Sequence, residues 1–197
     1  MSTALTTFAG SLEDVHYYFD HPSNWIVEDT AADGQGAGVV SVLGPDGKLM
    51  ASLTVLTYLE VGSGCEPGKC LHRPAVYLGD WAGQTPMSVF GPFVVRTLAM
   101  DLAGFPEDRL RYGWPNNVRV VTSIYSATNP PSNSYFPPGM FGVGRVETGV
   151  VAVDGNTDRI VHFDSFRDFG TLGEAQAYSR TEEHSQIQAM IASFREQ

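Results

Sequence analysis

Two cysteines lie close together near the middle of the chain, in the segment Cys65-Glu-Pro-Gly-Lys-Cys70. The Pro-Gly pair favours a turn, which brings the two Cα atoms toward the separation of about 5–6 Å that a disulfide requires. We expect a disulfide in an oxidising compartment and two reduced thiols in the cytosol. His72 completes a set of three soft zinc ligands, but no fourth ligand is evident. We therefore predict no bound metal and no cofactor, with a small metal-binding module as an alternative.

Histidines are the other residues that could take part in catalysis, because a hydrolase needs one beside a nucleophile and an orienting acid. The chain has five: His16, His21, His72, His162 and His184. On a strand, His162 and Asp164 would share a face, since they are two residues apart. No Gly-x-Ser-x-Gly elbow accompanies them. A hydrolase that uses His162 or His72 in a central cleft is thus an alternative function, and we predict no catalytic residues.

A segment rich in proline and aromatic residues covers positions 128–142. Its prolines prevent a regular helix or the interior of a strand, and long segments of this kind within a domain often carry function. We expect its apolar side chains, together with two tryptophans from elsewhere in the chain, to contact a ligand or partner. The predicted binding residues are Trp81, Trp114, Tyr135, Phe136, Met140 and Phe141. Alternatively, these side chains pack under the segment as a satellite core.

The overall charge argues against two classes of partner. The chain has 12 Lys and Arg residues against 22 Asp and Glu residues, a formal net charge of −10. This charge repels phosphate backbones and anionic lipid head groups. We therefore expect no nucleic-acid partner, and an unidentified protein or small ligand instead.

Alternating and turn patterns predict a series of strands. Residues 39–43 and 49–59 flank Gly44-Pro-Asp-Gly47, which has the composition of a tight turn and predicts a hairpin. A second hairpin is predicted around 154–156. Further strands are expected at 15–19, 25–27, 75–78, 88–98 and 118–125. Regular helical crossovers are missing between them, so we predict an α+β fold with a mostly antiparallel sheet.

Two helices are predicted at the end of the chain. The spacing of a capping box occurs at Thr171 and Glu174 and again at Ser179 and Glu182. The last helix places its apolar side chains on one face, and we expect that face to pack on the protein's own sheet. These side chains are Ile187, Met190, Ile191 and Phe194.

The two ends of the chain carry a family resemblance. An aromatic strand leads into His21-Pro-Ser-Asn-Trp25, and the last helix finishes with Ser193-Phe-Arg195. This pairing resembles the Mog1/PsbP-like domains, including actinobacterial lipoproteins of the LpqN type. The resemblance implies an antiparallel sheet flanked by helices on both faces, an α/β/α sandwich. It also implies binding or scaffolding work, such as photosystem assembly, small-GTPase binding or a role in the bacterial envelope, and no catalytic residues.

This sequence departs from the family pattern in two ways. The lipobox cysteine of the lipoproteins is absent, and the middle, about residues 60–148, is longer and richer in aromatic residues, proline and glycine. We expect a flexible segment at 1–11 followed by a single domain at 12–197.

The sequence also gives expectations for membrane spans, compartment and oligomeric state. No stretch of about 18 apolar residues could span a membrane. The chain as given is expected in the cytoplasm, or outside it if a leader was removed, as a monomer or weak dimer. The preferred function is a non-catalytic binding or protein-interaction domain.

Overall fold

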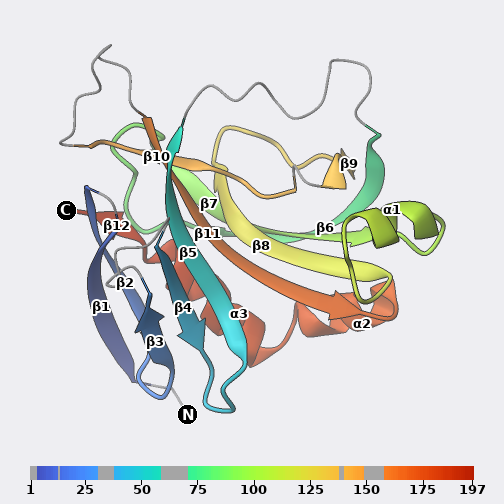
Figure 1. Ribbon diagram of the computed structural model, residues 1–197, viewed down its shortest axis with the longest axis horizontal. Coiled ribbons are helices and arrows are strands. Elements are labelled where there is room, and N and C mark those ends of the chain that lie inside the picture. The colour runs from blue at the N-terminus through green and yellow to red at the C-terminus, as the bar shows by residue number, and fades with distance from the viewer. Residues whose placement is uncertain (1–3, 13, 31–37, 59–70, 138–139, 149–157) are drawn as a thin grey trace.

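The computed structural model describes most of the chain together with its side chains (Figure 1). The described ranges are 4–12, 14–30, 38–58, 71–137, 140–148 and 158–197. Cys65, Cys70 and the predicted hairpin turn at 154–156 lie outside these ranges, so the disulfide and that turn stay predictions.

Strands make up most of the described structure. The first part of the chain forms β1 (Leu5–Leu12), β2 (Val15–Pro22), β3 (Ile26–Asp29), β4 (Val39–Leu43) and β5 (Leu49–Tyr58). The middle forms β6 (Arg73–Ala82), β7 (Phe93–Asp101), α1 (Pro106–Arg111), β8 (Val118–Ser126) and β9 (Ser134–Tyr135). The last part forms β10 (Gly144–Val146), β11 (Asp158–Phe169), α2 (Leu172–Tyr178), α3 (Glu182–Ala192) and β12 (Arg195–Glu196).

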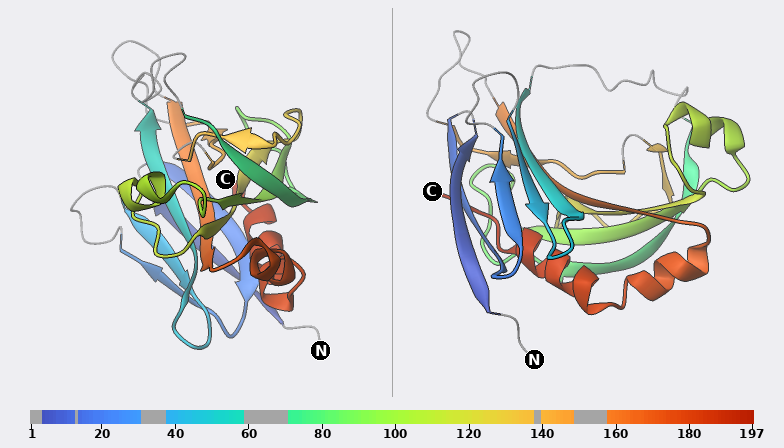
Figure 2. Two further views of the ribbon diagram at one scale, coloured as in Figure 1. Left: turned by 90° about the vertical axis from the view of Figure 1, so that its right-hand side faces the viewer. Right: turned by 60° about the horizontal axis from the view of Figure 1, so that its bottom comes forward.

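The strands form two antiparallel sheets. The smaller has the order β1-β2-β12, and the larger has the order β3-β4-β5-β11-β8-β7-β6-β9, with β10 paired to β11. Strand β11 joins the two halves of the larger sheet, because Asp158–Asp164 pairs with β5 whereas Ser165–Phe169 pairs with β8. The larger sheet curves strongly, as Figure 2 shows, and so has a concave and a convex face.

The predicted α/β/α sandwich with helices on both faces is wrong. Strands account for 51% of the structure and helices for 16%. Helices α2 and α3 lie along the convex face, whereas α1 is a helix of six residues at the far end of the larger sheet (Figure 2). The antiparallel prediction itself is correct. No described helix covers the concave face; instead Tyr135, Met140 and Phe141 pack on its apolar side chains, while β9 and β10 pair edge to edge with β6 and β11.

The main core lies between the convex face, the smaller sheet and α3. The predicted helix face is confirmed for Ile187, Met190 and Ile191, which are fully or almost fully buried. Phe194 is buried with them, but α3 ends at Ala192, so Phe194 lies past the end of the helix. Phe194 stacks on Tyr17 of β2, with ring centroids 5.9 Å apart, and meets Phe163 of β11 edge-on at 6.3 Å. The two ends of the chain therefore meet in one core.

One predicted helix cap is confirmed and the other is wrong. Thr171 and Glu174 form both hydrogen bonds of a capping box at the start of α2. Helix α3 begins after Thr181, whose hydroxyl accepts a hydrogen bond from the His184 backbone N–H. Ser179 instead ends α2, because its backbone N–H donates back to the Ala175 carbonyl.

The start of the chain contributes a strand where we expect a flexible segment. Residues 5–12 form β1, which pairs with β2 from Leu5 opposite Pro22 to Leu12 opposite Val15. Its inward side chains include Phe8 and Leu12, separated by Gly10, so the apolar alternation is interrupted and the pattern is easy to miss.

Candidate binding pocket

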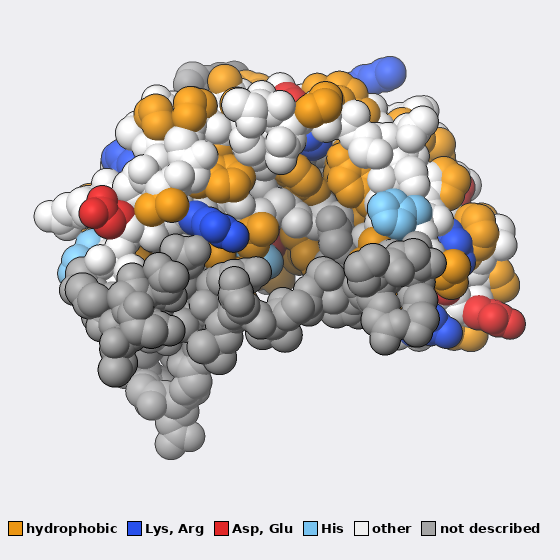
Figure 3. Space-filling view, turned by 90° about the horizontal axis from the view of Figure 1, so that it is seen from above, with side chains coloured by type: hydrophobic (Ala, Val, Ile, Leu, Met, Phe, Trp, Pro, Cys, Tyr) orange, Lys and Arg blue, Asp and Glu red, His pale blue; other side chains and the backbone are white. Residues whose placement is uncertain are grey.

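The concave face carries a group of aromatic and aliphatic side chains at the end near α1, which we call the aromatic cluster. Its buried members are Ala75, Leu98, Met100, Leu102, Trp114, Val121 and Met140, and the partly buried members are Phe105, Tyr112, Tyr125, Tyr135, Phe141 and Phe166. Antiparallel register places Leu98, Val121 and Phe166 side by side on β7, β8 and β11. Figure 3 looks toward this side of the molecule and shows hydrophobic side chains around a hollow.

A small pocket of about 180 Å³ opens in the aromatic cluster. Its lining consists of Tyr112, Trp114, Arg119, Pro137 and Phe141. Chain segments that are far apart in the sequence supply these side chains: the turn after α1, strand β8 and the segment before β10.

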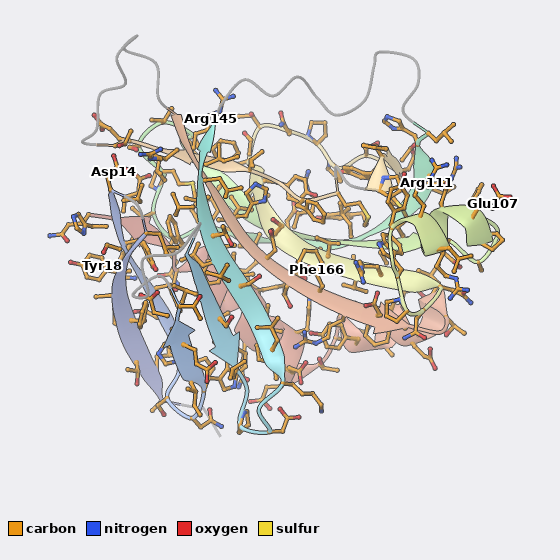
Figure 4. The ribbon with its side chains drawn as sticks, viewed as in Figure 1. Asp14, Tyr18, Glu107, Arg111, Arg145 and Phe166 are labelled. Atoms are coloured by element: carbon orange, nitrogen blue, oxygen red, sulfur yellow. The ribbon has the colours of Figure 1, made fainter. Side chains whose placement is uncertain are left out.

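Ring contacts hold two walls of this pocket in place. Phe141 meets Phe166 of β11 edge-on, with centroids 5.5 Å apart, and Phe136 meets Tyr112 in the same way at 6.5 Å. Figure 4 labels Phe166 near the middle of the curved sheet. Edge-to-face pairs of this kind favour one relative orientation of the rings. The pocket is therefore shaped before any ligand enters.

Arg119 supplies the one charged group of the lining. Its Nε and Nη2 donate to the two carboxylate oxygens of Asp168 at 2.8 and 2.9 Å. Its guanidinium lies over the Trp114 ring at 4.9 Å and over Phe166 at 5.8 Å. Within the described part of the chain, Nη1 has no hydrogen-bond partner, so its two N–H groups are available to an acceptor.

Five of the six predicted binding residues come together here. Trp114 and Phe141 line the pocket, and Tyr135 and Met140 belong to the aromatic cluster. Phe136 reaches the cluster through its contact with Tyr112. Met140 is fully buried and Trp114 is 6% exposed, so both serve as packed core as well. The satellite-core interpretation therefore describes Met140 and Trp114, and the binding interpretation stays a prediction.

Trp81 is the predicted binding residue that lies elsewhere. It stands opposite Val95 in the β6–β7 pair, and Val95 belongs to the main core on the convex face. Trp81 is 42% exposed and lies on the other side of the sheet from Trp114. It therefore does not line the same pocket.

Sequence reasoning missed Tyr112, Arg119 and Pro137. Arg119 is one cation inside the apolar strand β8, and Asp168 is one carboxylate inside the aromatic end of β11. A charged residue within an otherwise apolar strand indicates a buried side chain that forms an ion pair with a residue of opposite charge. The pairing partner depends on strand register, which the sequence alone does not supply.

A second arginine–aspartate pair has the same geometry further along the concave face. Arg96 of β7 donates from Nε and Nη2 to Asp80 of β6 at 2.9 and 2.8 Å, and its guanidinium lies over the Tyr125 ring. Burial raises the pKa of Tyr125 above its ordinary value. Arg96 itself is buried, so this pair orders the sheet beside the pocket.

Ser123, Asp164 and His162 meet on the concave face, but not in the order that a hydrolase uses. The Ser123 hydroxyl donates to Asp164, and the His162 Nδ1 lies 3.6 Å from the other oxygen of that carboxylate. The expectation that His162 and Asp164 share a face is confirmed. A nucleophilic serine needs the imidazole next to its hydroxyl, with the acid behind it. Here the carboxylate lies between the two, so His162 cannot take the serine proton.

A second hollow, of about 660 Å³, lies beside the smaller sheet and is acidic. Asp14, Glu147 and Glu196 line it, but Glu196 accepts hydrogen bonds from the Ser88 backbone and hydroxyl. Asp14 accepts a hydrogen bond from Arg159 at 2.7 Å. These contacts explain the carboxylates of Asp14 and Glu196 as structural groups.

Comparisons with other proteins give no match: no family model, no curated protein and no solved structure matches this chain. The resemblance of the chain ends to Mog1/PsbP-like domains therefore stays a prediction. The described helices include none long and apolar enough to cross a membrane. Among the same residues, no three His, Cys, Asp or Glu side chains are grouped to hold a metal ion.

Proposed function

We propose that this chain is a non-catalytic binding domain whose pocket, lined by Tyr112, Trp114, Arg119, Pro137 and Phe141, receives a planar ring of a small ligand. The observation that carries the proposal is the stacked arrangement of Arg119 on Trp114 inside a preformed apolar pocket. Small-ligand sites are typically apolar cavities with a few placed polar groups.

The size of the pocket limits the ligand to one ring. Pockets for drug-sized molecules measure about 300–1,000 Å³, whereas this one measures about 180 Å³. Aromatic walls favour a flat π-system, because rings prefer stacked or edge-on contacts with each other. A ligand larger than one ring would extend out of the pocket.

Arg119 requires the ligand to carry a polar group in addition to its apolar ring. Asp168 already neutralises the guanidinium charge, but Nη1 keeps its N–H donors. A hydrogen-bond acceptor on the ring, such as a carboxylate or carbonyl oxygen, would satisfy them. The proposed ligand class is a single planar ring that carries an acceptor.

Nuclear magnetic resonance of the three tryptophan side chains tests this proposal with benzoate as the probe. We expect benzoate to shift the indole N–H signal of Trp114, whereas cyclohexanecarboxylate, which has the same charge but no flat ring, leaves it in place. The signal of Trp81 should not move with either compound, because Trp81 lies on the other face.

Two variants test whether benzoate binds in this pocket. Phe141→Ala removes one wall and should weaken benzoate binding at least tenfold, whereas Trp81→Ala, an aromatic residue outside the pocket, should leave it unchanged. The proposal fails if benzoate does not shift the Trp114 signal at millimolar concentration. It also fails if cyclohexanecarboxylate shifts that signal equally.

A further inference from the structure

Strand β1 forms an outer edge of the smaller sheet with nothing paired beyond it among the described residues (Figure 1). It is eight residues long, from Leu5 to Leu12, and contains no proline and no charged side chain. Exposed edges of this length are templates for a further strand, and proteins normally block them with charge, proline or a bulge.

The other exposed edges of the structure carry such blocking features. Strand β3 has only four residues and ends in Glu28 and Asp29. At the opposite end of the larger sheet, β9 has only two residues, and the part of β6 beyond it has Asp80 and an irregular register before Gly79. Strand β12 has two residues, both charged. Of these edges, β1 is therefore the long, uncharged one to which a further strand can pair.

Hydrogen bonds identify which backbone groups of β1 point outward. The Ser23 N–H donates to the Ala4 carbonyl at 2.8 Å, which continues by one residue the register that places Leu5 opposite Pro22. Residues of an antiparallel pair alternate between bonded and non-bonded positions. The bonded positions are therefore Thr6, Phe8, Gly10 and Leu12, and the residues whose N–H and C=O groups point away from β2 are Leu5, Thr7, Ala9 and Ser11.

Strand β2 agrees with this assignment. Asp20, opposite Thr7, donates its N–H to the Ser193 hydroxyl at 2.7 Å, away from β1. His16, opposite Ser11, accepts from the Gln197 N–H at 3.0 Å. The groups of β2 that face away from β1 thus have their own partners, whereas the matching groups of β1 have none in the described structure.

We infer that β1 pairs with β1 of a second copy of this chain, in an antiparallel arrangement about a twofold axis through Phe8. The outward residues are placed symmetrically about position 8, so Leu5 meets Ser11 and Thr7 meets Ala9. Each outward N–H and C=O then has a partner. The two Phe8 side chains meet at the centre in a non-bonded position, where side chains lie closest.

The charge of the chain determines how this pairing should depend on salt. The whole chain carries −10, so two copies repel each other at long range. Strand β1 is neutral, and salt screens the remaining charge beyond about 8–10 Å at ionic strengths of about 0.1–0.15 M. Self-association should therefore strengthen from low to physiological salt.

Hydrogen exchange measured at low and high protein concentration tests the pairing. We expect the amides of Leu5, Thr7, Ala9 and Ser11 to exchange quickly in dilute protein and at least tenfold more slowly in concentrated protein. The amides of Thr6, Phe8, Gly10 and Leu12, which already bond to β2, should be protected at both concentrations.

A matched pair of variants at one position completes the test. Ala9→Pro removes an outward N–H without changing charge, and Ala9→Ser keeps it. Sedimentation should show Ala9→Pro associating at least tenfold more weakly than the wild type, with Ala9→Ser unchanged and both melting as the wild type does. The inference is overturned if the wild type shows no dependence on concentration, or if Ala9→Pro associates as well as Ala9→Ser. Protection of these amides by an unrelated extended peptide alone would also overturn it, in favour of a foreign strand.

Discussion

Arg119 on β8 and Asp168 on β11 stand directly opposite each other and are joined by two parallel hydrogen bonds of 2.8 and 2.9 Å. Both side chains are about one-fifth exposed. The pair therefore bridges two central strands and holds the guanidinium over the Trp114 ring.

Replacing Asp168 with Asn should lower the free energy of unfolding by about 1–2 kcal/mol, because it leaves a half-buried guanidinium without its charged partner. Urea denaturation measures the change. Asp46→Asn is the control, since Asp46 pairs with Lys48 on an exposed turn and its loss should have no measurable effect. Equal losses in the two variants would contradict a special role for the Arg119 pair.

His184 should make stability depend on pH. Its Nε2 lies 3.0 and 3.2 Å from the hydroxyls of Thr97 and Thr122, and its Nδ1 lies 3.0 Å from the Ser179 carbonyl. Burial holds the pKa of His184 below its ordinary value of 6.5, and Arg167 lowers it further against the opposing effects of the Ser179 hydrogen bond and Glu183. The folded protein thus keeps the imidazole neutral.

Below pH 6.5 the unfolded chain binds a proton at His184 more readily than the folded protein does. Stability is therefore full above that pH and declines as pH falls toward the folded pKa. His184→Gln should flatten this decline in urea denaturation at a series of pH values. His16→Gln, at an exposed position on β2, should keep the wild-type decline. A steep decline that survives in His184→Gln would assign it to other groups.

Gly142 allows the segment over the concave face to approach β8 closely. A Cβ added at Gly142 would lie 1.4 Å from the Ile124 carbonyl oxygen, and backbone there cannot move aside easily. Gly142→Ala should lower the free energy of unfolding by about 2–3 kcal/mol, the upper part of the usual range for overpacking, and weaken benzoate binding by displacing Phe141. Gly104→Ala, where the added Cβ meets nothing within 4 Å, is the control and should change stability by about 0.5 kcal/mol or less.

Phe194 links the end of the chain to its beginning. Because it is fully buried between Tyr17 and Phe163, Phe194→Ala should lower the free energy of unfolding by about 3–5 kcal/mol. Leu110→Ala, on the exposed side of α1, should have little effect in the same urea measurement. A small loss for Phe194→Ala would mean that the two chain ends do not share one core.

The local features of this fold were predictable from the sequence. The turn at Gly44-Pro-Asp-Gly47 connects β4 and β5 as expected, and the capping box at Thr171 begins α2. Both depend on contacts between residues within a few positions of each other. The apolar face of α3 was equally clear, because the helical period places its members together.

The features that were missed depend on contacts across long stretches of chain. Arg119 and Asp168 are 49 positions apart, and only strand register brings them together. The helices were expected on both faces because the resemblance of the chain ends implied it, whereas side chains such as Tyr135, Met140 and Phe141 pack on the concave face. Similarly, Trp81 was grouped with Trp114 by residue type, and the sheet places them on opposite faces. Prolines in the sequence mark the segment that contributes Tyr135, Phe136, Met140 and Phe141 to the aromatic cluster, and its role in binding stays a prediction.

Strand β11 has a consequence for the order in which the chain is made. Its first residue in the pair with β5, Asp158, meets Tyr58, a residue that leaves the ribosome 100 positions earlier. Until β11 emerges, no strand joins the two halves of the larger sheet. The edge of β5 that pairs with β11 in the folded protein is unpaired during this time. Chains with such distant pairings fold slowly and expose strand edges meanwhile. Synthesis of this protein should therefore depend on chaperones that shield strands β5 and β8 until the last quarter of the chain arrives.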